Sequence, residues 1–201
     1  MHLPVPGERE TNDMSTTELR VSGFGGQGVI LCAYIIGRAA ALHDKKHATL
    51  TQSFGPEARG SACSAQVILS DEPVLYPYVH HPDVLVCMSQ EAYTRFEPEV
   101  EPDGTILYEA ELVKPKPARD KMKVHGVPAT RFAEELGRTI MVNIVMLGFF
   151  TAVTGLLPQE AARKAVEESV PEGTQKPNLA AFDKGYEYGV KLISEAAAVK
   201  A

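Results

Sequence analysis

The spacing of hydrophobic and polar residues predicts short strands along most of the chain. Apolar residues in these segments either alternate with polar ones or run continuously, as in strands buried on one face or on both. Six segments show one of the two patterns: Glu18–Gly23, His47–Ser53, Ser61–Ser70, Asp83–Ser89, Thr105–Tyr108 and Val124–Val127.

Helical spacing of apolar residues fills most of the intervals. The first helix, from about Gly26 to Leu42, is apolar on nearly every face, so we expect neighbours on more than one side. The others span Gln90–Phe96, Pro128–Leu136 with Thr130 as a candidate N-cap, Asn143–Thr154, Pro158–Ser169 and Leu179–Ala198. Strands that alternate with helices imply right-handed crossovers. We therefore expect a single Rossmann-like α/β domain, with a mostly parallel sheet flanked by helices.

The chain has 201 residues, which is the length of one domain. Its first residues, Met1–Thr17, are polar and lack the apolar centre of a signal peptide. We expect a flexible N-terminal tail over residues 1–17, one α/β domain over residues 18–201, and a cytoplasmic location. Met14 is an alternative start.

Charge and hydropathy exclude two classes of partner. Twenty Lys and Arg against 26 Asp and Glu give a net charge of −6, which argues against binding to a nucleic-acid backbone. The longest apolar stretch, Ile140–Val153, is interrupted by polar residues and glycine, and is shorter than the ~20 residues of a membrane span. We expect neither a nucleic-acid partner nor a membrane span.

The cysteines argue against a metal site held by this chain alone. Cys32, Cys63 and Cys87 are odd in number, far apart and without a Cys-x-x-Cys pair. A disulfide framework and a self-contained zinc or iron–sulfur site are therefore not expected.

A glycine loop, Gly23-Phe24-Gly25-Gly26-Gln27-Gly28, lies between the first predicted strand and the first helix. In this context, backbone N–H groups and a helix N-terminus can hold an anion. A dinucleotide site also needs an acid at the end of the second strand, which here ends in Thr51-Gln52-Ser53, and no Gly-Lys-Ser/Thr of a phosphate loop follows. Two alternatives remain: close packing of strand and helix, or a backbone surface facing another subunit or a phosphate-bearing ligand.

A second loop, Phe54-Gly55-Pro56-Glu57-Ala58-Arg59-Gly60, follows the second strand, and the two loops together resemble the gamma subunit of the 2-oxoacid:ferredoxin oxidoreductases. Asp71-Glu72-Pro73, Asn143–Gly148 and Lys176-Pro177-Asn178 extend the resemblance, which covers about Glu18 to Leu192. The chain departs from the family pattern at Ser61, where a second glycine is usual, and Cys63 lies just beyond.

The resemblance implies a subunit of a hetero-oligomeric enzyme that oxidatively decarboxylates a 2-oxo acid to an acyl-CoA and CO2. Thiamine diphosphate, Mg2+ and [4Fe-4S] clusters would belong to alpha, beta and ferredoxin-like delta subunits, and coenzyme A would be a co-substrate. Electrons would pass to ferredoxin or to an additional flavin subunit. This chain would hold none of the cofactors and would not be catalytic alone.

By the same resemblance, both loops lie near coenzyme A or at a subunit contact. Arg59 offers a bidentate partner for a phosphate or carboxylate, and Glu57 is either a charge partner of Arg59 or an acid–base group. The segment from Tyr76-Pro77 to His81 is expected to be contact surface. The candidate residues are Gly23, Phe24, Gly25, Gly26, Gln27, Gly28, Phe54, Gly55, Pro56, Glu57, Arg59, Gly60 and Asn143.

Two other functions stay open at this level. One is a stand-alone Rossmann-type nucleotide-binding oxidoreductase, against which the missing acid counts. The other is a purely structural scaffold subunit of the same complex. The substrate is not determined by these motifs, although 2-oxoglutarate or an aromatic 2-oxo acid is weakly favoured.

Overall fold

The computed structural model describes residues 16–53, 62–119 and 121–200 of the protein, which form an α/β domain around one six-stranded sheet. The strand order is β2-β3-β1-β4-β5-β6. The strands are β1 (Thr16–Phe24), β2 (His47–Ser53), β3 (Ala62–Ser70), β4 (Val84–Cys87), β5 (Thr105–Glu109) and β6 (Lys123–Val127).

The sheet is mostly parallel, as the sequence predicts. Strands β1, β4, β5 and β6 pair in parallel, whereas β3 is antiparallel to both of its neighbours, β1 and β2. Strand β3 therefore lies between β1 and β2. The connection from β1 through the first helix leads to β2, which is not adjacent to β1 in the sheet. All six predicted strands are present, with ends that differ by at most a few residues.

Six α-helices are described, and each matches a predicted one. They are α1 (Val29–Arg38), α2 (Gln90–Phe96), α3 (Ala129–Glu135), α4 (Val142–Thr154), α5 (Gln159–Ser169) and α6 (Gln175–Lys200). Helix α1 continues as a π-helical turn over Ala39–His43, and α6 begins at Gln175 instead of Leu179.

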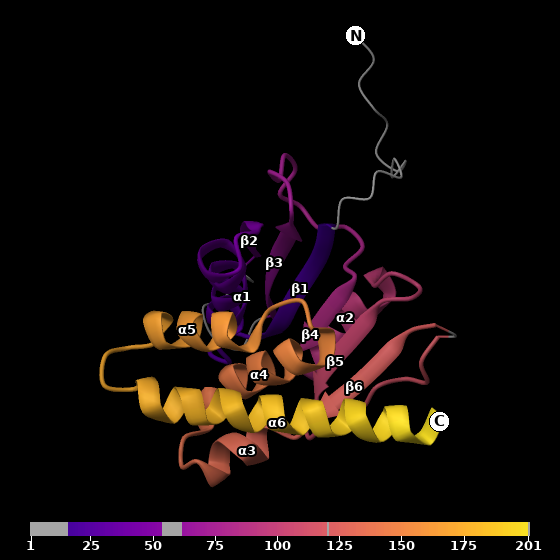
Figure 1. The fold of residues 1–201 in the computed structure, drawn as a ribbon. Helices are drawn as coiled ribbons and strands as arrows, with labels where there is room; N and C mark the ends of the chain where they lie inside the picture. The colour runs from indigo at the N-terminus through magenta and orange to yellow at the C-terminus, as the bar shows by residue number, and fades with distance from the viewer. Residues whose placement is uncertain (1–15, 54–61, 120, 201) are drawn as a thin grey trace.

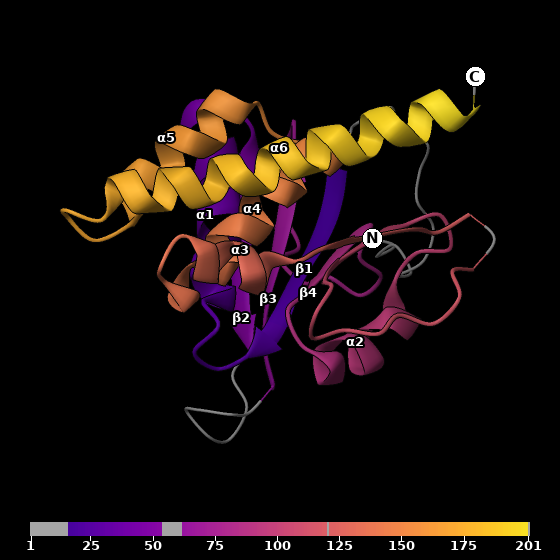
Figure 2. The ribbon, with the colours of Figure 1, turned by 90° about the horizontal axis from the view of Figure 1, so that it is seen from below.

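The helices form unequal layers on the two faces of the sheet. Helices α1, α3, α4, α5 and α6 gather on one face and α2 lies on the other (Figures 1 and 2). Nine successive residues of α4, Asn143–Thr151, are buried, because α4 contacts α1, α3, α5, α6 and β5. The main core therefore lies around α4, and a smaller core that includes Leu85, Phe96 and Ile106 lies under α2.

Helices α4 and α6 touch through their backbones. A Cβ atom at Gly148 would overlap the carbonyl oxygen of Phe182, and one at Gly185 would overlap that of Val145. Glycine is required at both positions because no side-chain movement relieves a clash with backbone.

Two details differ from the sequence-based expectations. Thr16 and Thr17 already pair with Ser70 and Leu69, so the sheet begins inside the segment expected to be a tail, and residues 1–15 lie outside the described part. Thr130 is not the N-cap of α3: that position is Pro128, whose side chain makes no capping hydrogen bond. Within residues 16–53, 62–119 and 121–200, no helix is both long and apolar enough to cross a membrane.

Replacement of Gly148 by alanine should lower the free energy of unfolding by about 3 kcal/mol, the upper part of the overpacking range, because α4 and α6 must separate. Gly37→Ala is the matched control: its Cβ would lie 3.9 Å from Ala48 Cβ and Val67 Cγ1, an ordinary contact. Helix propensity alone should make that variant more stable by up to ~1 kcal/mol. Urea unfolding measures both, and equal stability of the two variants would contradict the proposed close approach.

Candidate functional site

The glycine loop leaves β1 and enters α1 through two left-handed residues. Gly26 has a φ of 99° and Gly28 a φ of 73°, and residues other than glycine rarely adopt these backbone angles. Gly28 is the N-cap of α1, so no side chain caps this helix, and its first turn carries no acidic residue. The first-turn N–H groups and the positive end of the helix dipole are therefore available for an anion.

Gln27 fastens the loop to the neighbouring strand. Its Oε1 accepts a hydrogen bond from the Phe24 N–H at 2.7 Å, and its Nε2 donates to the carbonyl of Met88 at 2.9 Å. Met88, directly after β4, donates its own N–H to the carbonyl of Ser22 on β1 at 2.9 Å. These bonds fix the loop against the carboxyl ends of β1 and β4.

Asn143 meets the loop from the first turn of α4. Its Nδ2 donates to the Gly28 carbonyl at 3.2 Å, and the side chain is only 3% exposed. A Cβ atom at Gly28 would overlap the amide group of Asn143. The structure thus brings together two candidate residues that are 115 positions apart in the sequence.

Two hollows adjoin the loop, and Gly26 and Ile140 line both. One, of about 440 Å3, is also lined by Gln27, Leu112, Thr130 and Val142. The other, of about 390 Å3, is also lined by Gly28, Leu31, Arg138, Met141, Asn143, Ile144, Val170, Pro171, Thr174 and Asn178. Among the described residues that line these hollows, Arg138 alone is charged.

The two hollows combine a cation with exposed apolar surface. Ile140 is 76% exposed and Leu112 is 45% exposed, although both are large apolar residues. Arg138 lies beside the start of α1 and supplies a positive charge where that helix already favours anions. The site therefore fits an elongated ligand with a phosphate group and an apolar portion. Arg138, Ile140 and Leu112 are not among the residues predicted from the sequence.

A buried carboxylate fixes the backbone of two residues that line the site, Leu112 and Thr130. Glu109, at the end of β5, is fully buried, and its carboxylate accepts hydrogen bonds from the N–H groups of Glu111, Leu112 and Thr130. These three bonds, at 2.9, 2.6 and 3.1 Å, place Leu112 and the start of α3 next to the glycine loop. The sequence predicts that Thr130 caps the start of α3. In the structure, the Glu109 carboxylate takes this role, because it accepts a hydrogen bond from a backbone N–H in the first turn of the helix.

The second predicted loop lies outside the described residues. This applies to the candidates Phe54, Gly55, Pro56, Glu57, Arg59 and Gly60, and to Ser61. The residues that flank it are described: Ala62 pairs with Phe24, and Ser53 pairs with Ser64. Both flanks therefore lie at the same end of the sheet as the glycine loop.

The described residues do not fit an iron–sulfur cluster or a metal ion. No group of three or more His, Cys, Asp or Glu side chains in that part of the chain could hold one. All three cysteines are buried, and burial raises the pKa of the Cys32 and Cys87 thiols to about 12 and also raises that of Cys63. These groups stay protonated near neutral pH, whereas thiolates are the metal-binding form.

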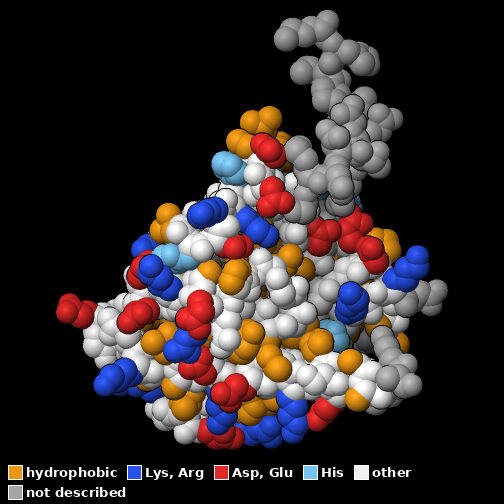
Figure 3. All heavy atoms as spheres, viewed as in Figure 1, with side chains coloured by type: hydrophobic (Ala, Val, Ile, Leu, Met, Phe, Trp, Pro, Cys, Tyr) orange, Lys and Arg blue, Asp and Glu red, His pale blue; other side chains and the backbone are white. Residues whose placement is uncertain are grey.

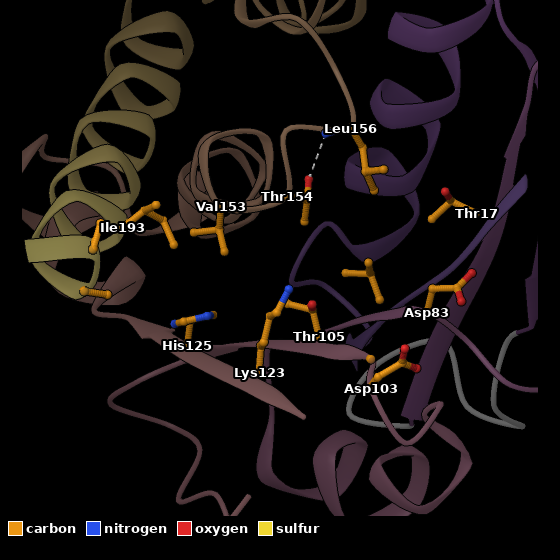
Figure 4. Close-up of a pocket in the computed structure, with 14 residues that line it drawn as sticks. Thr17, Asp83, Asp103, Thr105, Lys123, His125, Val153, Thr154, Leu156 and Ile193 are labelled. Carbon is orange, nitrogen blue, oxygen red and sulfur yellow. Dashed lines mark hydrogen bonds between the residues drawn. The ribbon is translucent and has the colours of Figure 1, made fainter. Parts of the chain in front are cut away.

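A further hollow, of about 660 Å3, lies at the opposite end of the sheet (Figure 4). Lys123 and His125 of β6 line it below α4 and α6, with Asp83 and Asp103 further along. Burial, and less strongly the charge of Lys123, lowers the pKa of His125 below its usual 6.5. Ligands of open α/β sheets bind at the carboxyl ends of the strands, so the glycine-loop end is the candidate site.

Comparison with known proteins identifies a family. Residues 18–188 match the model of the pyruvate ferredoxin/flavodoxin oxidoreductase family. The chain is 48% identical over 181 residues to 2-oxoglutarate synthase subunit KorC of Methanocaldococcus jannaschii, covering 87% of this chain and 95% of that subunit. It is 33% identical to pyruvate synthase subunit PorC of Methanothermobacter marburgensis, covering 85% and 96%.

A solved structure agrees with these relatives. The gamma subunit of a keto/oxoacid ferredoxin oxidoreductase from Geobacter sulfurreducens superposes with a TM-score of 0.77 at 37% identity, covering 87% of this chain and 99% of that one. The fold class predicted from the sequence and the stated resemblance are both confirmed.

Gly28→Ala should destabilise the protein through two separable causes. Left-handed strain costs about 1–2 kcal/mol for a residue with a Cβ, and the clash with Asn143 adds to it. In an Asn143→Ala background the clash with the amide group is removed and only a contact of 3.1 Å with the Cβ of residue 143 remains, so the same Gly28 change should cost less. A double-mutant cycle by urea unfolding measures the difference, and full additivity would contradict the contact.

His125→Asn should flatten the pH dependence of stability in mildly acidic solution. Because the folded pKa of His125 is lowered, the unfolded chain binds this proton first as pH falls. The stability linked to neutral His125 is therefore present above pH ~6.5 and is lost as pH falls through the folded pKa. Melting temperatures at pH 7.5 and 5.5 test this, and an identical drop in variant and wild type would refute it.

Proposed function

The chain belongs to the pyruvate ferredoxin/flavodoxin oxidoreductase family as a gamma-type subunit, and from this premise we propose that it positions coenzyme A in a complex that oxidises 2-oxoglutarate. The observation that carries the proposal is the combination at the glycine loop of an uncapped helix start, one arginine and two adjoining hollows.

Coenzyme A matches that combination chemically. Its phosphates need N–H donors and cations, which the first turn of α1 and Arg138 offer, and its pantetheine arm needs apolar surface such as Leu112 and Ile140. Gly23–Gly28 and Asn143 fix the backbone against which the ligand lies. Phe54–Gly60, with Glu57 and Arg59, complete the site in this proposal, because their flanks leave the sheet beside it.

The cofactors of the reaction belong to other subunits in this proposal. Thiamine diphosphate with Mg2+ supplies the carbanion chemistry of decarboxylation when bound, and [4Fe-4S] clusters carry single electrons. The described residues of this chain offer no ligand set for either metal centre. Its own residues bind and orient the acyl acceptor, and alpha, beta and delta subunits complete a cytoplasmic complex that reduces ferredoxin.

The relatives support 2-oxoglutarate as the substrate. Identity to the 2-oxoglutarate synthase subunit is 48%, against 33% to the pyruvate synthase subunit, at similar coverage. The proposal extends to the domain division, in which residues 18–201 form one α/β domain that includes both loops, although β1 itself begins at Thr16.

Arg138→Ala in the assembled complex should raise the KM for coenzyme A about tenfold or more, the effect of removing one charged hydrogen bond to a phosphate. The KM for 2-oxoglutarate should stay unchanged, because this arginine does not touch the oxo acid in the proposal. Arg59→Ala should act in the same way. Steady-state assays with 2-oxoglutarate, pyruvate and an aromatic 2-oxo acid also test the substrate.

Lys191→Ala is the control, since Lys191 is an exposed cation on α6 paired only with Glu195 among the described residues. It should leave both KM values unchanged. If Arg138→Ala and Arg59→Ala assemble normally with an unchanged KM for coenzyme A, the positioning role is wrong.

A further inference from the structure

A protruding loop between β3 and β4 carries large apolar side chains into solvent. We call residues 71–82 the aromatic loop. Leu75 is 95% exposed, and Tyr76 and Tyr78 are 58% and 56% exposed. The loop extends beyond the end of β3 in Figure 1, and Figure 3 shows hydrophobic side chains gathered there next to acidic ones. Three such residues within four positions are unusual for free surface.

The base of the aromatic loop is fixed to the sheet at one buried residue. Val79 is only 2% exposed, and its N–H and carbonyl both bond to the side chain of Gln66 on β3, at 3.0 and 3.2 Å. Its carbonyl also accepts from Nη2 of Arg20 at 3.1 Å. Arg20 is itself buried and pairs with Glu99 at 3.0 Å.

The tip is ordered by its own aromatic rings. Tyr76 packs edge-on against Tyr78 with ring centroids 5.5 Å apart, and stacks on His80 at 6.0 Å. The Tyr76 hydroxyl and His80 Nε2 are also hydrogen bonded at 3.1 Å. Rings held in one arrangement lose little conformational freedom on binding, so the tip is preorganised for a partner.

We infer that the aromatic loop anchors this chain to a catalytic subunit of its complex, by inserting Leu75, Tyr76 and Tyr78 into an apolar pocket edged with Lys or Arg. The inference rests on the proposed function for the identity of the partner. Glu72, exposed at the base of the loop, is complementary in charge to the basic edge. Tyrosine is also among the residues that dominate binding energy at protein interfaces.

The shape of the loop argues against a second copy of this chain as the partner. A twofold dimer through the loop would set one convex tip against another, which buries little area. A tip inserted elsewhere on a second copy would make a head-to-tail contact, which grows into rings or filaments. A different chain with a concave surface avoids both outcomes.

The contact is an anchor within a larger interface. Each tyrosine brings roughly 150–250 Å2 to a contact, whereas a stable interface needs ~800 Å2 per partner. The aromatic loop also lies at the Thr16–Ser70 end of the sheet, away from the glycine loop beside Phe24. Its loss should therefore weaken assembly without changing the coenzyme A site.

The test is co-expression of the full chain with the other chains of the complex, comparing wild type with a Leu75→Ser, Tyr76→Ser, Tyr78→Ser triple variant. The triple variant should keep the wild-type melting temperature as an isolated chain, because the three side chains are exposed. Its affinity for the catalytic subunits should fall at least tenfold, measured by titration of the purified components. A Glu72→Lys variant should bind more weakly by a smaller factor, with reduced salt dependence.

The control replaces exposed apolar residues elsewhere: Leu42→Ser with Val190→Ser, at positions 62% and 44% exposed. This control should bind as wild type does. Undiminished assembly of the triple variant would overturn the inference, as would loss of self-association in place of loss of subunit binding. If the wild-type chain itself fails to bind thiamine- and cluster-containing chains, the proposed function fails instead.

Discussion

The direct backbone contact between α4 and α6 is the constraint on which the rest of the site depends. Gly148 and Gly185 let the two helices touch, and this sets how deeply α4 lies in the core. The depth of α4 in turn places Asn143, in its first turn, against the carbonyl of Gly28. The close contact between α4 and α6 thus helps to fix the residue that holds the carbonyl of Gly28, the N-cap of α1.

Local pattern predicted the elements well but not their order in the sheet. Every strand and helix has a periodic signal of its own, and Gln90–Phe96 matches α2 at both ends. The antiparallel insertion of β3 between β1 and β2 left no such signal, because pairing partners are a long-range choice. The dinucleotide test assumed that the end of β2 lies next to the glycine loop, and β3 occupies that place instead. An acid at the end of β2 would therefore not lie where the dinucleotide test requires it.

The candidate site was predicted where a motif exists and missed where only geometry defines it. Sequence motifs placed the glycine loop and Asn143 in one candidate set, and the structure brings Gly28 and Asn143 into contact. Arg138 and Ile140 lie at the junction of α3 and α4, where no periodicity or spacing marks a residue. Glu109 was missed because a lone acid at the end of a strand looks solvated, whereas here three backbone N–H groups surround it.

The hairpin that β2 and β3 form has a consequence for how this family can diversify. Ser53 and Ala62 are held in register by Ser64 and Phe24, so both ends of the intervening segment are fixed independently of its length. Doubling such a segment costs only about 0.6 kcal/mol in closure entropy, and it displaces neither β1 nor α1. The scaffold therefore tolerates changes in the length of this segment, and only the proposed contacts of Glu57 and Arg59 with coenzyme A restrict them.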